Sequence, residues 1–482
     1  MIRYVFTSAD RPEYHESMLI MKMRATAAPP RRAGVRAAAA LTDTESPGLS
    51  ILSAMERNGA IKRITPLAPE AEKRGPRAAA SFGVAALAAS ARPSESKDPN
   101  QGVHLVEMEK GSSVSEVQSR LADDPSVEFV SRVPVRYLLA RARPTRKASS
   151  SAALAVPPPA STMWNLDKIL WKQARAIKGF KDAAKIRVAV LDTGVDRKHP
   201  DLKGRVKNYT FLHPDIPDAS GEQDIIGHGT HVSGTIGALI NNRLGINGIC
   251  VCELNDWKIF TDIPELVSFE EGYGYFVDPV MYRRALADCI DQDIDVINLS
   301  IGGPGKPDRQ EQALFDALIA NGTTVVAAMG NEREDGSPTS FPAAIRGVIA
   351  VGATSLDDSI ANFSNRGNHI SLCAPGVGIW STLPTNPGQF GFTAVRGADG
   401  KPKEGKRVKR ETNYDSWDGT SMATPHVTAA VALLLAARGK MKPADVRGQL
   451  MKTVDRVKGM GNKKFDPDFG AGRLNLLRLL TL

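Results

Sequence analysis

The stretch IRVAVLDTG, residues 186–194, decides the fold class because it is an almost unbroken run of apolar residues. Such a run is typical of a strand that is buried on both faces of a parallel sheet. Three more runs of this kind follow along the chain, and they are DVINLSIGG (295–303), TTVVAAMGN (323–331) and GVIAVGAT (347–354). Helical patterns separate them. The sequence therefore predicts an α/β domain, a doubly wound and mostly parallel sheet with helices on both faces.

The net charge of +9 over 482 residues raises the question of a nucleic-acid partner. Residues 1–150 hold 23 Lys and Arg against 16 Asp and Glu, whereas residues 151–482 hold 39 against 37. The larger part therefore lacks the basic face that nucleic-acid binding needs. The basic first part has no aromatic platform for bases, so we expect no nucleic-acid partner. A mobility-shift assay on residues 1–150 would test that alternative.

The sequence also predicts where the protein works. No apolar run approaches the roughly 18 residues of a membrane span, so we expect no membrane partner. The first residues lack the basic start, apolar core and cleavage site of a secretory signal, which favours a cytoplasmic location. The four cysteines, Cys250, Cys252, Cys289 and Cys373, do not form a Cys-x-x-Cys motif. We interpret them as free, buried thiols.

Three zones follow one another along the chain. Residues 1–140 show the order βαββαβ, which predicts a small α+β domain of the ferredoxin-like kind. Its runs are 19–25, 49–59, 60–68, 104–110, a helix from Ser113 with Glu116 in a capping box, and 127–140. Residues 141–162 are rich in Ala, Ser and Pro and predict an exposed linker with processing sites. Residues 163–482 form the predicted α/β domain.

Two polar residues are candidates for the chemistry, which in such a domain collects at the carboxyl ends of the strands. The strand predicted within 186–194 ends at Asp192, although an Asp before Thr-Gly is also typical of a simple turn. His228, in GHGTHVSGTIGAL (227–239), comes just before an apolar helix and on its own is as well explained by capping. The two histidines of this motif lack the intervening Glu of a zinc protease, so we do not expect a metal.

Ser421 is the third candidate, in SWDGTSMATPHVTAAVALLLAARG (416–439), at the start of a long apolar helix. The helix N-terminus supplies unsatisfied N–H groups and a positive partial charge. These donors would stabilise an oxyanion formed beside Ser421. A capping serine explains the position but not the run around it. Because a serine hydroxyl needs a base and an orienting group, Asp192, His228 and Ser421 together predict a nucleophilic serine.

The motifs of the third zone resemble those of the subtilisin-like serine proteases, the subtilase family. The matching runs are VAVLDTGVDRKHPDL, HGTHVSGTIGA, DVINLSIGGP, VVAAMGNE, CAPGVGIWSTLP and DGTSMATPHV, in the order that the family has them. The resemblance implies peptide-bond hydrolysis through an acyl-enzyme. Ser421 would be the nucleophile, His228 the general base and acid, and Asp192 the group that orients the imidazole. Asn331 matches the family's oxyanion-hole residue.

The resemblance also implies how a protein or peptide substrate would bind. One edge would be Ser300, Ile301, Gly302 and Gly303, and the other wall of the S1 pocket would be Ala328, Met329 and Gly330, with Ser340 at the base. Gly274–Phe276 loosely matches the opposing edge. The acidic residues Glu332, Glu334 and Asp335 would favour a basic P1 side chain, or would simply be a solvated loop.

The same resemblance implies that no cofactor takes part in the chemistry. Asp201 and Asn242 resemble two side-chain ligands of the family's structural calcium site, because oxygen ligands of this kind suit calcium. The loop carries one extra residue, Ile240, compared with the usual pattern. We expect a monomer.

Two segments remain outside the catalytic assignment. The run VSEVQSRLADDPSVEFVSRVPVRYLLA resembles the second half of the family's inhibitor-type propeptide, which predicts a self-processed zymogen cut near Leu139 or Ala140. Residues 385–415 are a basic insert that would recruit an acidic partner, serve as a regulatory cleavage site or be a solvated loop. An inactive subtilase used as a binding module, and an intracellular processing protease of narrow specificity, are the alternative functions.

Overall fold

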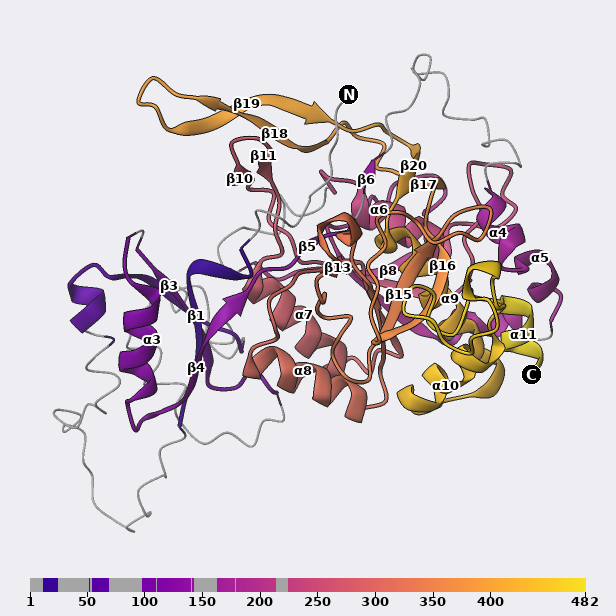
Figure 1. The fold of residues 1–482 in the computed structure, drawn as a ribbon, viewed down its shortest axis with the longest axis horizontal. Coiled ribbons are helices and arrows are strands. Elements are labelled where there is room, and N and C mark those ends of the chain that lie inside the picture. Colours follow the sequence, from indigo (N-terminus) through magenta and orange to yellow (C-terminus); the bar gives the residue numbers. More distant parts are fainter. Residues whose placement is uncertain are drawn as a thin grey trace, which may run out of the picture. The chain divides into compact units, whose positions relative to one another are not determined.

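The computed structural model describes residues 12–24, 52, 54–68, 98–109, 111–139, 141–142, 163–177, 179–213 and 224–482. These form two compact units. The smaller consists of Tyr14–Pro134 with Lys306–Leu314, and the larger holds Val135–Gly305 and Phe315–Leu482. Most of the predicted linker, 143–162, lies outside the described residues, so the predicted domain boundaries stay a prediction. Figure 1 labels the elements of both units.

The smaller unit is a four-stranded antiparallel sheet with a helix, as the βαββαβ order predicts. The sheet order is β2 (Ile61–Pro66), β3 (Val103–Met108), β1 (Tyr14–Met23) and β4 (Val127–Pro134). Residues 54–57 are helical between β1 and β2, and α3 (Val114–Ala122) lies between β3 and β4. Ser113 caps α3 by accepting a hydrogen bond from the Glu116 N–H, as the capping box predicts.

One prediction in this unit was wrong. Residues 127–140 do not form a single strand, because β4 ends at Pro134 and the chain then leaves the sheet. A proline has no N–H to donate and ends the ladder of hydrogen bonds. The short strands β5 (Tyr137–Leu138) and β6 (Arg141–Ala142) that follow pair with partners in the larger unit, to which this part of the chain belongs.

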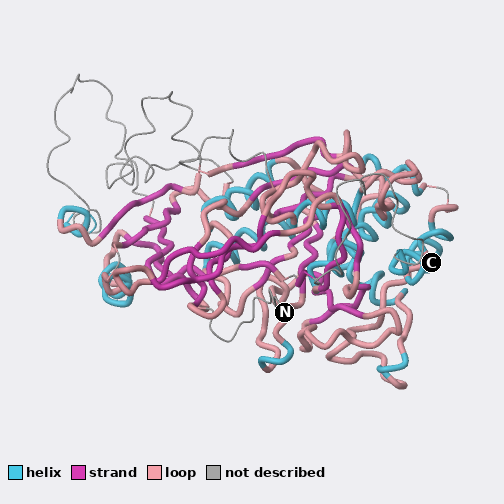
Figure 2. Tube along the Cα trace, turned by 90° about the horizontal axis from the view of Figure 1, so that it is seen from above, coloured by secondary structure: helices cyan, strands magenta, loops and turns pink. Residues whose placement is uncertain are grey.

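The larger unit is built on a seven-stranded sheet in which every pair of neighbours is parallel. The sheet order is β16 (Ile370–Pro375), β15 (Ile349–Thr354), β14 (Thr324–Ala328), β12 (Val296–Leu299), β7 (Arg187–Asp192), β9 (Glu253–Lys258) and β8 (Val206–Phe211). This confirms the predicted α/β fold class. Figure 2 colours these strands apart from the helices around them.

Both faces of the sheet are covered, as the apolar runs predict. In β7, Val188 and Val190 belong to the main core, while Ala189 and Leu191 on the other face are equally buried. The helices are α4 (Trp164–Lys168), α5 (Trp171–Ala174), α6 (His228–Gly237), α7 (Pro279–Asp291), α8 (Arg309–Ala320), α9 (Thr420–Arg438), α10 (Pro443–Thr453) and α11 (Leu476–Thr481), with 3₁₀ turns Phe180–Lys185, Arg333–Asp335 and Lys458–Met460. Of α8, the part from Phe315 onward belongs to the larger unit.

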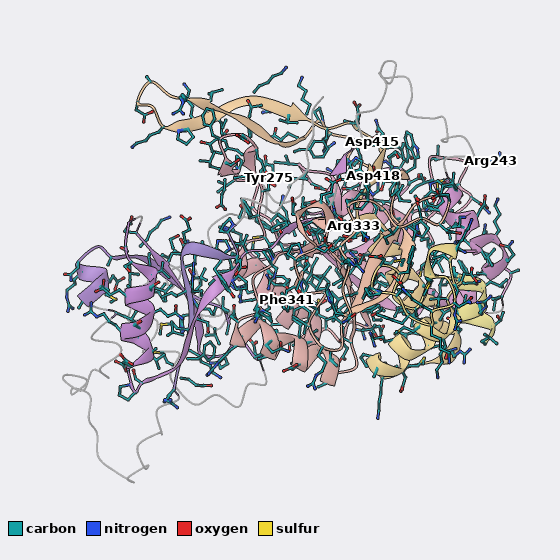
Figure 3. The ribbon with its side chains drawn as sticks, viewed as in Figure 1. Arg243, Tyr275, Arg333, Phe341, Asp415 and Asp418 are labelled. Carbon is teal, nitrogen blue, oxygen red and sulfur yellow. The ribbon has the colours of Figure 1, made fainter. Side chains whose placement is uncertain are left out.

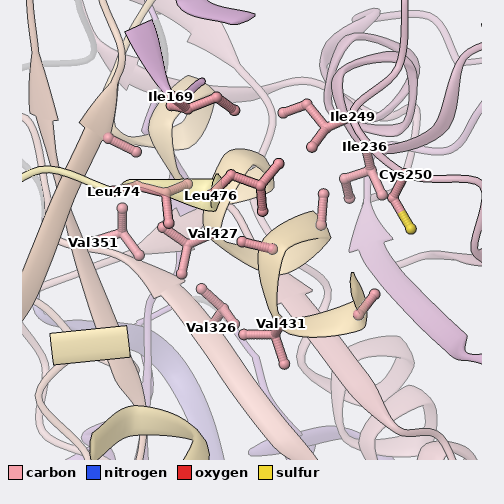
Figure 4. Packing of buried hydrophobic residues seen from close by; sticks show 14 of the residues in the cluster. Ile169, Ile236, Ile249, Cys250, Val326, Val351, Val427, Val431, Leu474 and Leu476 are labelled. Carbon is pink, nitrogen blue, oxygen red and sulfur yellow. The ribbon is translucent and has the colours of Figure 1, made fainter. Parts of the chain in front are cut away.

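Helix α9 is the centre of the main core. It packs across β12, β14, β15 and β16 and against α6, and Figure 4 shows its Val427 and Val431 among core side chains from several elements. Of the described helices, α9 alone is long and apolar enough to cross a membrane, but 89% of its apolar window is buried inside the unit. It is therefore explained as a core helix. All four cysteines are buried and free, as predicted.

Two smaller sheets lie beside the main sheet. The first has the order β10 (Glu265–Ser268), β11 (Gly272–Gly274), β18 (Gln389–Arg396) and β19 (Pro402–Lys409), so the predicted basic insert forms its outer hairpin. The second has the order β17 (Ile379–Thr382), β20 (Tyr414–Asp418) and β6, and β13 (Ile301–Gly302) pairs separately with β5.

Candidate active site

The carboxyl ends of three neighbouring strands carry the predicted site residues. Asp192 ends β7, Ser300 follows β12, and Asn331 comes three residues after β14. The strands β7, β12 and β14 are adjacent and parallel, so these residues share one edge of the sheet. His228 begins α6, and Ser421 is the second residue of α9.

Asp192 and His228 are joined directly. The Nδ1 atom of His228 lies 2.7 Å from Oδ1 of Asp192, and both side chains are buried. The same oxygen accepts the backbone N–H of Thr193 at 2.7 Å. This contact fixes the imidazole with Nδ1–H toward the carboxylate and leaves Nε2 as the basic nitrogen. Nε2 of His228 has no hydrogen-bond partner among the described residues.

The hydroxyl of Ser421 is buried and is held by a neighbouring backbone group. Its Oγ donates to the Ser300 carbonyl at 2.8 Å, and Ser300 Oγ donates in return to the Ser421 carbonyl at 3.0 Å. Asn298 donates to Ser300 Oγ at 3.0 Å and so supports this pair. The Ser421 hydroxyl and Nε2 of His228 are therefore not hydrogen-bonded to each other in this structure.

Asn331 is oriented by the first residue of α9. Its Oδ1 accepts both the backbone N–H and the hydroxyl of Thr420, each at 2.9 Å. An amide whose oxygen is held in this way presents its Nδ2 donor in another direction. The backbone N–H of Asn331 donates to Glu332 at 2.8 Å, so two sides of the residue are fixed.

The segment that we call the tail, Val135–Leu139 with Arg141 and Ala142, runs past the start of α9. The backbone N–H of Ser421 donates to the Leu139 carbonyl at 3.2 Å. Before Leu139, Tyr137 and Leu138 pair antiparallel with Gly302 and Ile301. After it, Arg141 and Ala142 pair antiparallel with β20. The Leu139 carbonyl is therefore the point at which the tail meets Ser421.

The predicted pocket residues divide into two groups. A Cβ at Gly302 would collide with Leu139 and with the Ser340 hydroxyl, so these three lie together. A Cβ at Gly303 would collide with the Val135 carbonyl, and Ala328 packs in a cluster with Val135, Tyr137 and Leu139. Met329 and Gly330 are instead buried beside Gly367 and Thr420 respectively.

The opposing edge lies close to its predicted place. Phe276 packs against the apolar side chains of the tail, and the Val277 N–H donates to the Arg136 carbonyl at 3.0 Å. The carboxylate of Glu332 is buried and accepts from the Asn365 amide at 2.8 Å as well as from Asn331. It is therefore engaged within the structure, while Glu334 and Asp335 are exposed.

The second histidine of the HGTH motif has a structural role. His231 stacks on Trp417 with ring centroids 5.0 Å apart, and its Nε2 lies 3.0 Å from the Ile379 carbonyl. Burial, followed by the charge of His228, lowers the pKa of His231 to about 3, so it stays neutral and donates from Nε2. Within the described residues, no group of three or more His, Cys, Asp or Glu side chains is arranged to hold a metal.

The predicted calcium ligands are satisfied by hydrogen bonds. Asp201 accepts from Asn242 Nδ2 at 2.5 Å, the Ile246 N–H at 3.0 Å and the Tyr414 hydroxyl at 2.9 Å. The Asn242 oxygen accepts the Leu244 N–H at 3.0 Å. A calcium ion is bound by oxygen lone pairs, but N–H and O–H groups already donate hydrogen bonds to the side-chain oxygens of Asp201 and Asn242. These residues do not fit a calcium shell as they stand.

This arrangement leads to a first prediction, on stability. Burial and the Asp201 carboxylate raise the pKa of Tyr414, which keeps its hydroxyl a donor. We expect Tyr414→Phe to lower the free energy of unfolding by about 1–3 kcal/mol, because Asp201 loses a partner. Chelation with EDTA should leave the Tm of the wild-type protein unchanged. A Tm that rises with added calcium and falls with EDTA would contradict this prediction.

Asp224 supports the start of α6 and is not among the residues that the sequence analysis predicts for the site. Its carboxylate accepts the N–H groups of Gly227 and Thr230 and the hydroxyls of Thr193 and Thr230, at 2.7–2.9 Å. Because these donors flank His228 and follow Asp192, Asp224 positions both. A signal was available, since an acidic residue shortly before a helix start favours capping.

Comparison with known proteins decides the family. The subtilase family profile matches residues 183–472, which include all the predicted catalytic residues. This chain belongs to the subtilase family of serine proteases. The major intracellular serine protease of Bacillus subtilis (strain 168) is 33% identical over 334 residues, which are 64% of this chain and 89% of the relative.

This subtilase matches about two thirds of the length of each of two further relatives. Subtilisin E of Bacillus subtilis (strain 168) is 33% identical over 295 residues, which are 60% of this chain and 64% of the relative. The structure of fervidolysin from Fervidobacterium pennivorans, a keratinolytic enzyme related to subtilisin, matches with a TM-score of 0.63 and 25% identity. That match covers 99% of this subtilase and 65% of fervidolysin.

Proposed function

We propose that this subtilase is a serine endopeptidase, made as a zymogen, that cuts its own chain between Leu139 and Ala140. The observation that carries the proposal is the hydrogen bond from the Ser421 N–H to the Leu139 carbonyl, with paired backbone on either side of it. Backbone pairing along a sheet edge is a usual way to hold a peptide substrate. Leu139 would then be the P1 residue.

The proposed mechanism follows from the contacts of three residues. Ser421 turns its hydroxyl to Nε2 of His228, which takes the proton while Oγ attacks the Leu139 carbonyl carbon. Asp192 holds Nδ1–H and stabilises the imidazolium. His228 then gives the proton to the Ala140 nitrogen, and the peptide bond breaks. Water, activated by the same imidazole, hydrolyses the acyl-enzyme and frees Ser421.

The oxyanion of the tetrahedral intermediate would be stabilised by two donors. One is the Ser421 N–H, which already donates to the Leu139 carbonyl. The other is the Asn331 side-chain amide, whose oxygen is occupied by Thr420. Donors that are fixed before the reaction need no reorganisation when the charge develops.

We propose that residues 1–140 act as an intramolecular inhibitor of the protease. Val135, Tyr137 and Leu139 are buried in the larger unit, so after cleavage the tail would still fill the site as a product. Residues 141–162 would be trimmed later. We further expect a cytoplasmic monomer without a cofactor for the chemistry, and these statements remain predictions.

The contacts of the tail support the narrower proposal, that this protease cleaves few sequences. Arg136 would be the P4 residue, and its side chain is only 2% exposed. Its guanidinium donates to the Gly305 carbonyl at 2.8 Å, and its own carbonyl accepts from Val277. A buried charged side chain is costly unless it is hydrogen-bonded, so the site at P4 is matched to arginine.

A second prediction tests this function with peptides. We expect Arg-Tyr-Leu-Leu-aminomethylcoumarin to be hydrolysed after the second leucine by the processed protein. Replacing the arginine with norleucine should lower kcat/KM about tenfold or more, because the bond to Gly305 involves a charged donor. A fluorophosphonate probe should label Ser421, as peptide mass mapping would show. If the peptide were not hydrolysed and Ser421 were not labelled, the results would instead support an inactive subtilase that acts as a binding module.

A further inference from the structure

The predicted basic insert is an ordered hairpin, which we call the basic arm and define as residues 389–409. Its strands β18 and β19 pair antiparallel, and β18 also pairs with β11. The arm thereby extends the hairpin β10–β11 into a sheet of four strands with β19 at its edge (Figure 1). The arm itself, β18 and β19, carries neither a triad residue nor a predicted pocket residue.

The arm carries a concentrated positive charge. Its exposed basic residues are Arg396, Lys401, Lys403, Lys406, Arg407 and Lys409, against the exposed acids Asp399 and Glu404. None of these six basic side chains forms an ion pair with the described part of the chain. Lysines on an edge strand also discourage aggregation, so charge alone does not identify a partner.

Exposed apolar side chains accompany the charge. Six large apolar residues are exposed in the described parts of the chain, and four of them lie on this sheet or just before it, namely Ile263, Leu266, Phe269 and Val395. Ile263 is 59% exposed and Phe269 is 46% exposed. Arg396 lies over the Phe269 ring, 5.0 Å from its centroid. A surface with basic and apolar groups together is typical of a protein interface.

The base of the arm is firmly attached to the larger unit. Gln389 donates to the Tyr275 hydroxyl at 2.8 Å, and Tyr275 is labelled at this point in Figure 3. Arg410, which directly follows the arm, donates to the carbonyls of Asp224, Ile225, Pro384 and Glu411. These bonds fix the direction in which the arm leaves the unit.

Two strands of the four-stranded sheet, β11 and β19, lead along the chain into segments that pair with the tail. After β11 the chain continues through Tyr275 and Phe276 to Val277, which donates to the Arg136 carbonyl. After β19 it continues to β20, which pairs with Arg141 and Ala142. The four-stranded sheet that holds the arm is therefore continuous with the segments that contact the tail on both sides of Leu139.

We propose that the basic arm is a docking surface for an acidic segment of the protein substrate, outside the residues that fill the active site. The proposal rests on the proposed function, and it adds a selection of substrates that the pocket alone does not provide. The partner would carry Asp or Glu side chains opposite the lysines and an apolar side chain against Leu266 and Phe269. Such a surface raises the association rate of oppositely charged partners.

The test uses a variant in which Lys401, Lys403, Lys406, Arg407 and Lys409 are all replaced by Gln. Reduced and alkylated α-lactalbumin serves as an acidic unfolded substrate, and reduced and alkylated lysozyme as a basic one. We expect kcat/KM for the acidic protein to fall about tenfold in the variant, since several surface charge pairs are lost together. The basic protein and the coumarin tetrapeptide should be cleaved as by the wild type.

Two controls complete the test. The first control replaces the four arm lysines with Arg, and it should retain the wild-type preference for the acidic protein over the basic one. The second control has Gln at five exposed basic positions elsewhere and should also retain this preference. These positions are Arg438, Lys440, Lys442, Lys452 and Lys464. The wild-type preference should vanish near 1 M salt, where the screening length is about 3 Å. Equal cleavage of acidic substrate by the variant and the wild type would overturn the proposal, even if the arm bound DNA or anionic vesicles. If the wild type itself did not cleave the tetrapeptide, the proposed function would be contradicted instead.

Discussion

The Ser421→Ala chain is expected to remain uncut, whereas the wild type is expected to release a fragment that begins at Ala140. The alanine removes the hydroxyl oxygen that would attack the Leu139 carbonyl carbon but leaves the backbone N–H that donates to the carbonyl oxygen. We expect a loss of about 10⁶-fold in cleavage rate, the size known for loss of the serine in subtilisin, a member of this family. Intact mass and N-terminal sequencing measure the outcome.

The variant should fold as the wild type does, and this separates chemistry from stability. The lost hydroxyl donates to the Ser300 carbonyl, so a change of about 1 kcal/mol in the free energy of unfolding is the expected limit. Ser416→Ala, on the neighbouring strand β20, is a matched control that should process normally. If Ser421→Ala matured at the wild-type rate, another residue would be the nucleophile or another protease would make the cut.

Four strands of the large sheet could be predicted from the sequence because a buried parallel strand has a simple, mostly apolar pattern. The runs around β7, β12, β14 and β15 are apolar at most positions, since both faces of the sheet are covered. The neighbouring strand β9 was not predicted, because its sequence, ELNDWK, is mostly polar. Its Asp256 is buried and accepts from Ser233, a contact between distant segments that a local pattern does not contain.

The candidate site was predictable residue by residue but not in its details. The motifs around Asp192, His228 and Ser421 identify the types of residue that the chemistry needs. The sequence did not predict that Ser421 Oγ donates to the Ser300 carbonyl, nor that Tyr414 donates to Asp201. Each of these contacts joins residues more than 100 positions apart, so only the folded chain determines it.

The tail shows most clearly where sequence reasoning stops. The run 127–140 predicts a single strand, whereas β4 ends at Pro134, which has no N–H to donate to the next residue pair. Which residue would meet Ser421 depends on the register with Ile301 and Gly302, and a shift by one residue would send each side chain to the other face. The structure fixes this register and thereby the expected cut after Leu139.

Replacement of Asn331 is expected to produce the second large effect, on turnover rather than on binding. Asn331→Asp keeps the shape of the side chain and an oxygen for Thr420, but it replaces the Nδ2 donor with a second oxygen. A carboxylate oxygen facing the oxyanion repels it, so the loss should be at least the 10²–10³-fold in kcat that is typical of one missing donor. KM for the tetrapeptide should change little, because the charge appears only in the transition state.

A neutral replacement and a positioning control make this assignment specific. Asn331→Ala should lower kcat by about 10²–10³-fold without the added repulsion, and so by less than Asn331→Asp. Thr420→Val removes one of the two donors that orient the amide, while the backbone N–H of residue 420 remains. It should therefore cost only a few-fold in kcat. A Thr420→Val loss as large as that of Asn331→Ala, or a rise in KM that accounts for the whole effect, would show that Asn331 supports the structure and does not stabilise the oxyanion.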